Sequence, residues 1–318
     1  MVDYLSYFQY FGMELLINVG IVLACSVVFA ILGTFFGCLF AGIDRKISAK
    51  MQGRVGPPIL QPYYDVRKLF DKDRVSVNGS EKVYVTFALI FVFIAGGIFL
   101  SSFVYYSLGS LTDGSNWLLC IFVLTLATML FIMAAYSSRS PYAEIGGARE
   151  ILQVVAYEPT TMLMAVGLCL VTNSFSVQSV LMLDVPLITF LFPTFFCFLF
   201  ILIIKFRKSP FDISMSHHAH QEIVRGMTTE MSGPTLGKVE IMHWNENFLF
   251  MGWIAVFFVC SNPMWILGAV VAVVLVYLLM IWIDNNFARV KWQAMLKWSW
   301  LLCLILCGLN LVVLMFMV

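Results

Sequence analysis

The sequence contains few charged residues: only 12% of its 318 residues are Asp, Glu, Lys or Arg, whereas 61% are hydrophobic. Soluble domains usually carry about 25% charged residues, so this scarcity excludes a soluble globular protein. The net charge of +1 provides no excess of basic residues, and we expect no nucleic-acid partner. The apolar runs are continuous rather than alternating, which excludes a transmembrane β-barrel.

The sequence also lacks the cysteine and histidine spacings of a metal centre. Its eight cysteines all lie in apolar stretches and form no CxxC pair, the spacing that zinc sites and iron–sulfur clusters use. No HExxH motif is present. We therefore expect no metal or cofactor bound by this chain. Any redox centre that it works with should belong to another subunit.

Eight apolar runs are present, and an α-helix needs about 20 such residues to cross a bilayer. They predict an all-α, polytopic transmembrane helical protein that forms a single membrane domain over residues 1–318. The sixth run is short, and its helix could begin earlier in the sequence. The predicted spans are residues 14–43, 83–107, 117–136, 151–172, 186–206, 246–260, 264–283 and 298–318.

Basic residues are absent from one side of this arrangement. All 19 Lys and Arg residues fall in four long segments on the other side, with Lys205 at the edge of the third. Lys and Arg concentrate in cytoplasmic loops, so we predict a multi-pass protein of a prokaryotic cell membrane with both termini outside. The predicted cytoplasmic loops are residues 44–82, 137–150, 207–245 and 284–297.

The first cytoplasmic loop combines helix-breaking residues with an amphipathic pattern. Its glycines and prolines forbid a continuous helix, but from Tyr63 to Phe70 apolar residues recur at helical spacing opposite charged ones. This pattern predicts a surface helix that either lies on membrane lipid or docks a soluble partner. The residues expected at a docking surface are Arg54, Gly56, Pro57, Pro58, Gln61, Pro62, Asp65 and Lys68.

Two acidic residues lie near or inside the fourth predicted span. Glu150 and Glu158 are eight residues apart and therefore lie within about a quarter turn of each other on a helix. An ionised carboxylate at membrane depth is costly, and such a residue suggests function by default. The alternative is a structural ion pair with Arg149 or with another helix.

The stretch "SPFDISMSHHAHQEIVRGMTTEMSGP", from Ser209 to Pro234, gathers further charges and three histidines. Histidine titrates near neutral pH, so hydrogen bonding or proton relay explains this composition better than a metal site. We expect proton or ion coupling to involve the charged and histidine residues of these stretches. They are Glu144, Arg149, Glu150, Glu158, Asp212, His217, His218, His220, Glu222, Arg225, Glu230 and Glu240.

Four motifs together resemble a known family. They are "KISAKMQGRVGPPILQPYYDVRKLF", "EIGGAREILQVVAYEP", "SPFDISMSHHAHQEIVRGMTTEMSG" and "WQAMLKWSWLLCLILCGLNL". In this order they resemble the membrane subunit beside the quinone chamber of respiratory complex I. They are still more similar to its counterpart in Ech-type, energy-converting membrane-bound [NiFe] hydrogenases. Quinone-linked members typically follow "PFD" with a proline and further carboxylates, whereas this chain continues "ISMSHHAHQE".

The resemblance implies a non-catalytic subunit of an oxidoreductase complex with no redox centre of its own. It would dock the hydrogenase large and small subunits and a ferredoxin-like cluster subunit, which would carry the [NiFe] centre and [4Fe–4S] clusters. An antiporter-like membrane subunit would lie alongside. The complex would couple ferredoxin-driven hydrogen evolution to H⁺ or Na⁺ translocation. The alternatives are the equivalent subunit of a quinone or sulfur-compound reductase, and a self-standing ion transporter.

Overall fold

The computed structural model describes residues 4–75, 79–108, 116–211, 214–215 and 225–317. Within these ranges the regular secondary structure is helical, as predicted. The main helices are α1 (Tyr4–Met51), α2 (Gln61–Phe70), α3 (Gly79–Leu108), α4 (Trp117–Ser137), α5 (Pro141–Thr172), α6 (Val177–Leu181), α7 (Phe192–Lys205), α8 (Gly233–Phe258), α9 (Met264–Asn286), α10 (Trp292–Leu302) and α11 (Gly308–Met317). Short turns η1 (Leu187–Thr189) and η2 (Gly226–Thr228) precede α7 and α8, and the π-helical turn η3 (Cys303–Cys307) joins α10 to α11.

Six helices of the described chain are long and apolar enough to cross a membrane, when the continuous helix Trp292–Phe316 counts as one. The shorter apolar helix α7 and the helix α8 account for the two remaining predicted spans. Every predicted apolar run therefore corresponds to a helix. This agreement supports the prediction of a polytopic helical membrane protein.

Several helices begin or end inside segments that we predicted as loops. Helix α8 begins at Gly233, well before the predicted span 246–260, and α5 begins at Pro141 inside the predicted loop 137–150. Both helices have a proline in their first turn, where the missing N–H costs nothing. Helix α1 likewise continues to Met51, beyond the predicted end of the first span. Apolar composition failed to locate these ends because charged residues continue the helices.

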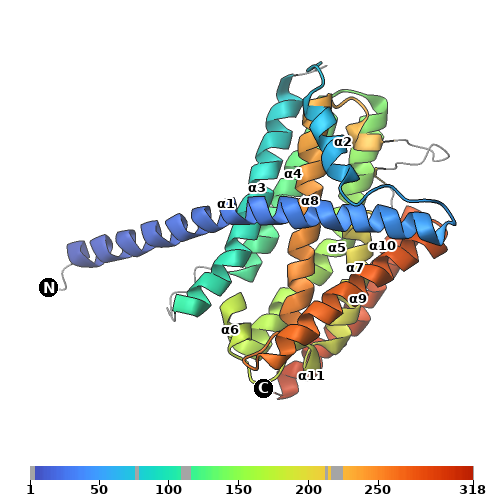
Figure 1. Cartoon of the computed structure of the whole chain (residues 1–318). Helices are drawn as coiled ribbons and strands as arrows, with labels where there is room; N and C mark the ends of the chain where they lie inside the picture. Colours follow the sequence, from blue (N-terminus) through green and yellow to red (C-terminus); the bar gives the residue numbers. More distant parts are fainter. Residues whose placement is uncertain (1–3, 76–78, 109–115, 212–213, 216–224, 318) are drawn as a thin grey trace.

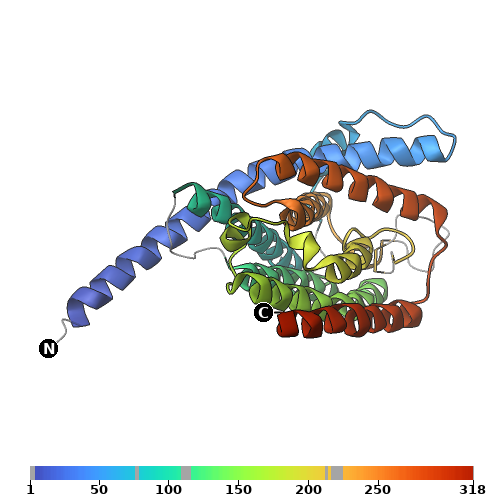
Figure 2. The same ribbon diagram turned by 90° about the horizontal axis from the view of Figure 1, so that it is seen from below.

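Helix α1 crosses the other long helices instead of running along them. In Figure 1, α3, α4, α5 and α8 run roughly upright while α1 passes across them. Figure 2 shows that its C-terminal half packs along one side of the bundle and its N-terminal half projects away. The projecting half exposes apolar side chains such as Leu16 and Leu23.

Glycines allow α1 to pack closely against the bundle. A Cβ atom on Gly37 would lie 2.4 Å from the backbone oxygen of Trp244 in α8, and one on Gly97 of α3 would lie 2.7 Å from the Cα of Ser26 in α1. Such close backbone approach is typical of small residues at membrane helix interfaces. The main hydrophobic core lies between α3, α4, α5, α7 and α8.

Candidate functional site

A group of charged side chains lies buried between α5, α7 and α8. Glu150 of α5 is 4% exposed and Glu246 of α8 is 6% exposed. Arg207, just after α7, places its Nη2 3.4 Å from Glu150 Oε1 and also contacts the imidazole of His243. The Nδ1 of His243 lies 3.3 Å from Glu246 Oε2. We call these four residues and Lys205 the central charge cluster.

Lys205, the last residue of α7, completes the charge balance of the cluster. Its Nζ lies 3.7 Å from the centre of the Tyr157 ring, a cation–π distance, and interacts electrostatically with Glu246 and Glu150. With His243 neutral, the two carboxylates and two cations sum to no net charge. Buried charges are tolerated in proteins when they are paired in this way, and removing one partner leaves the other uncompensated.

The backbone at Arg207 turns the chain sharply after α7. Arg207 has a φ of 52°, in the left-handed region that non-glycine residues rarely adopt. Its guanidinium lies 5.6 Å from the ring of Phe131 in α4, in addition to its contacts with Glu150 and His243. A left-handed residue costs about 1–3 kcal/mol and persists where surrounding contacts hold it. Here the contacts are those of the central charge cluster.

A small cavity adjoins the cluster. Its volume of about 10 Å³ is close to that required for one water molecule. Thr128, Gln153 and Tyr157 line it together with cluster residues. Glu150 Oε2 has no hydrogen-bond partner among the described residues, although it is buried. A water placed in this cavity would have polar side chains on several sides and the Glu150 carboxylate oxygen as an acceptor.

A second ion-pair group ties α1 and α9 to the segment after α7. Lys208 Nζ contacts the carboxylate of Asp44 in α1 and lies 3.1 Å from Asp284 Oδ2 in α9. Burial by itself lowers the pKa of Lys208. The two neighbouring carboxylates raise it by more than burial lowers it, so the pKa lies above the ordinary lysine value. Lys208 is therefore held as a cation, next along the chain to Arg207.

Two of the predicted coupling residues lie at or beside the cluster. Glu150 is a member, and it pairs with Arg207. Glu158, two turns further along α5, accepts a hydrogen bond from Thr125 of α4 and interacts electrostatically with Lys205. The predicted grouping of Glu150 and Glu158 on one helix is thus consistent with this geometry.

The remaining coupling residues that the structure describes are not members of the central charge cluster, although Glu240 interacts electrostatically with His243. Glu144 and Arg225 are exposed, whereas Arg149, Glu230 and Glu240 are partly buried. Asp212, His217, His218, His220 and Glu222 lie outside the described residues.

Glu230 interacts electrostatically with Glu81, a carboxylate at the start of α3 that we did not predict as a site residue. Glu81 is 2% exposed, and its Oε2 has no hydrogen-bond partner within the described part of the chain. A second, smaller acidic site therefore lies beside η2 and α3.

Sequence reasoning missed most of the central charge cluster. Lys205 and Arg207 look in the sequence like the basic edge of a cytoplasmic loop, and His243 and Glu246 do not stand out. The available signal was weak: a lysine at the end of an apolar run, and a histidine three residues before a glutamate. The three histidines near position 218 drew the prediction away from His243.

The predicted docking residues lie on a surface segment. The structure places a helix at Gln61–Phe70, as the amphipathic pattern predicted, and it buries Pro62 and Val66. Of the expected docking residues, Arg54, Pro58 and Lys68 are exposed, Gly56, Pro57, Gln61 and Asp65 are partly buried, and Pro62 is buried. The exposed residues are available to a partner, and the buried ones position the segment.

No cluster of three or more His, Cys, Asp or Glu side chains able to hold a metal ion occurs among the described residues. The side chains brought together at the cluster are instead of both charge signs.

Residues 23–315 match the family described as NADH dehydrogenase. The chain belongs to this family. It is 26% identical over 294 residues to one of the subunits of NADH-quinone oxidoreductase from Dehalococcoides mccartyi, covering 86% of this chain and 80% of that protein. It is 30% identical over 208 residues to Hydrogenase-4 component C of Escherichia coli K12, covering 62% and 63% of the two chains.

The fold also matches a chain of the membrane-bound sulfane sulfur reductase, an archaeal respiratory membrane complex. The TM-score is 0.79 at 24% identity, over 92% of this chain and 99% of that one. This likeness establishes a shared fold. Family and fold together show a multi-pass membrane subunit of the complex I-like complexes, which confirms the resemblance found in the motifs.

Proposed function

We propose that this chain is the non-catalytic membrane subunit of an energy-converting hydrogenase. It docks a module with a [NiFe] centre and iron–sulfur clusters, and it couples ferredoxin-driven hydrogen evolution to translocation of H⁺ or Na⁺. Support comes from the hydrogenase component among its relatives and from the "PFDISMSHHAHQE" sequence, which resembles the hydrogenase branch. Exposed Arg54 and Lys68 offer a basic docking surface on the cytoplasmic side, and both termini lie outside.

The observation that carries the coupling proposal is the central charge cluster. Its carboxylates and cations are buried and interdependent, so a proton added to Glu150 or a displacement of Arg207 changes the electrostatic energy of every other member. Coulomb interactions at these separations are much stronger inside a protein than in water. A rearrangement beside the docked module would thus alter protonation at the cluster.

Glu158 and the cavity extend this polar group along α5. Lys205 lies within electrostatic range of both Glu150 and Glu158, and the cavity provides room for a bridging water. A water that accepts and donates hydrogen bonds links polar groups that do not touch directly. In the proposed mechanism Glu158 exchanges a proton in response to the charge state of the cluster.

The test compares Glu158→Gln with Glu144→Gln in the intact complex. Both variants remove one carboxylate from α5, but Glu144 is exposed and lies outside the cluster. We expect both complexes to assemble and to evolve hydrogen from an artificial electron donor at near wild-type rates. Ion movement in sealed vesicles should fall severely for Glu158→Gln alone. A Glu158→Gln complex that moves the normal number of ions per hydrogen would contradict the coupling proposal.

A complex I-like reductase of a quinone or sulfur compound is the second candidate. The similarity to the NADH-quinone oxidoreductase protein extends over more of this chain than the similarity to the hydrogenase component does. This difference in coverage favours the reductase. Metal analysis and lipid extraction of the purified complex separate the two candidates. Nickel without a stoichiometric quinone supports the hydrogenase, whereas a bound quinone without nickel supports the reductase. A self-standing ion transporter has less support, because the relatives are named as subunits or components.

A further inference from the structure

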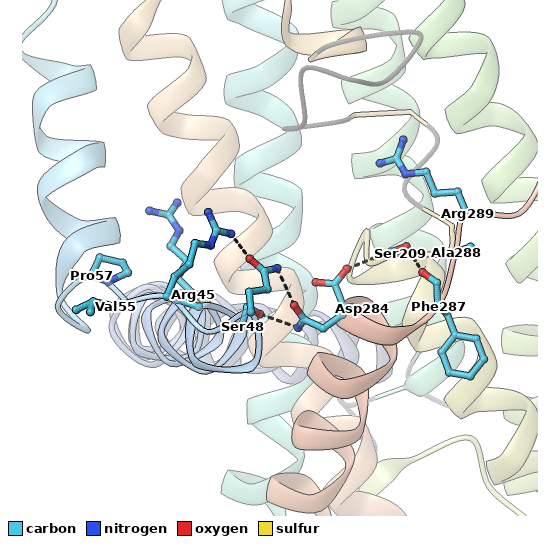
Figure 3. Close-up of a pocket in the computed structure, with 13 residues that line it drawn as sticks. Arg45, Ser48, Val55, Pro57, Ser209, Asp284, Phe287, Ala288 and Arg289 are labelled. Atoms are coloured by element: carbon cyan, nitrogen blue, oxygen red, sulfur yellow. Dashed lines mark hydrogen bonds between the residues drawn. The ribbon is translucent and has the colours of Figure 1, made fainter.

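A large pocket lies between the C-terminal ends of α1 and α9, and no member of the central charge cluster lines it. Its volume is about 690 Å³, within the range of small-molecule binding sites. Figure 3 shows residues from α1, from the segment after it, and from the end of α9 converging on this space. Arg45, Arg54 and Arg289 line it, and we call it the arginine pocket.

Side-chain amides build one wall of the pocket and fix α1 to α9. The amide of Gln52 donates to Asn285 Oδ1 at 2.9 Å, and Asn285 Nδ2 lies 3.0 Å from Ser48 Oγ. Ser209 adds a hydrogen bond to the carbonyl of Phe287 at 3.1 Å. The wall is therefore held in place by bonds within this chain, and the pocket is defined before a ligand binds.

The described residues that line the pocket carry a net positive charge. Among them Asp284 is the one acidic residue, and its carboxylate already accepts bonds from the backbone N–H of Ser209 at 2.8 Å and from Lys208 at 3.1 Å. Arg45 pairs with Asp65 at 2.7 Å, but each guanidinium has five N–H donors, so this pair leaves others for a ligand. Three arginines fit the oxygens of a phosphate group.

An exposed apolar surface leads from the pocket along α9. Trp282 is 50% exposed, and Leu278 and Leu275 continue the exposed surface toward the other end of the helix. Phe287 lies at the pocket edge with its side chain pointing away from the arginines (Figure 3). Aromatic residues of this kind lie at the boundary between headgroups and hydrocarbon. The site thus joins a cationic cavity to a lipid-facing helix.

We propose that the arginine pocket binds the phosphate headgroup of one anionic phospholipid, whose acyl chains lie along α9. Basic pockets between membrane helices bind acidic headgroups by this combination of cationic and apolar contacts. An acidic side chain of a partner subunit would match the arginines alone. The lipid matches the arginines and the apolar face of α9 together, and therefore accounts for more of the surface.

The test uses the whole purified complex, stripped of lipid and returned to phosphatidylcholine nanodiscs with increasing phosphatidylglycerol. Phosphatidylglycerol retained per complex is counted by mass spectrometry after transfer to mild detergent. Arg54→Gln/Arg289→Gln should lower the apparent affinity about 25-fold, at about five-fold per arginine. Arg67→Gln/Arg74→Gln removes the same charge from exposed positions in and just after α2, outside the named docking residues, and should leave the affinity unchanged. If the double variant fails to assemble, the single Arg289→Gln change is measured against the five-fold expectation.

Equal retention by wild type and the Arg54/Arg289 variant would overturn the proposal. So would a structure of the lipid-loaded complex in which a side chain of another subunit fills the pocket. Glycerol phosphate in solution separates the lipid from its headgroup: it should compete poorly, because it lacks the contacts along α9. Competition at the same concentration as the lipid would assign the pocket to soluble phosphates instead. None of these outcomes depends on whether the complex evolves hydrogen.

Discussion

The central charge cluster and the arginine pocket use the same kinds of residues in opposite ways. In the cluster, the carboxylates of Glu150 and Glu246 interact with the cations of Lys205 and Arg207. The chain therefore supplies both signs of charge and buries them together. In the arginine pocket, the cations outnumber the acids among the described lining residues, and they line an open cavity. The first arrangement is complete within this chain and can hold or transmit a charge state. The second is the place where we propose that a ligand from outside binds.

Removing one partner within the cluster should have the largest effect. Glu246→Leu leaves Lys205 and Arg207 with one buried carboxylate fewer, and breaking a buried pair destabilises by about 3–5 kcal/mol. We expect a matching loss of stability of the purified complex in denaturant titrations monitored by tryptophan fluorescence. Glu144→Leu, at an exposed carboxylate, is the control and should change little. A stable Glu246→Leu protein would mean that the cluster is not a closed set of charges.

An intermediate effect is expected from a change where α1 packs against α8. This contact joins the helix that lines the arginine pocket to the helix that carries His243 and Glu246 of the central charge cluster. In Gly37→Ala the new methyl group would meet the Trp244 carbonyl at 2.4 Å, so α1 must move away from α8. Overpacking of this kind costs about 1–3 kcal/mol. Gly20→Ala is the matched control, because a Cβ there meets nothing within 4 Å. Thermal unfolding in detergent should separate the two variants, and equal midpoints would show that α1 is not tightly seated.

The smallest effect is expected at the edge of the arginine pocket. Arg45 and Asp65 form an exposed pair, and such pairs contribute about 0–1 kcal/mol. Asp65→Asn should leave the unfolding midpoint nearly unchanged, while it frees the Arg45 guanidinium and strengthens phosphatidylglycerol binding. A large loss of stability would show that this pocket, like the cluster, is built around internal pairing.

The helices were predictable from the sequence because lipid selects for long apolar runs. The helix ends were less predictable, and the largest error was at the start of α8, where Lys238, Glu240 and Glu246 interrupt the apolar character of the helix. Glu150 and Glu158 were identified because an acid near an apolar run is conspicuous. Arg207 and His243 were not, because their roles arise from contacts between residues 36 positions apart in the chain. The oblique path of α1 is equally a product of packing, and no periodicity encodes it.

The length of α1 has a consequence for the surrounding bilayer. Its apolar part, residues 14–43, contains 30 residues, which extend about 45 Å at 1.5 Å each. The hydrocarbon layer is only about 30 Å thick, so a helix this long accommodates by inclining. A thicker or thinner membrane would change that inclination first, and Gln52 and Gly37 would transmit the change to α9 and α8. We therefore expect the packing of α1 against α8 and α9 to depend on the thickness of the surrounding membrane.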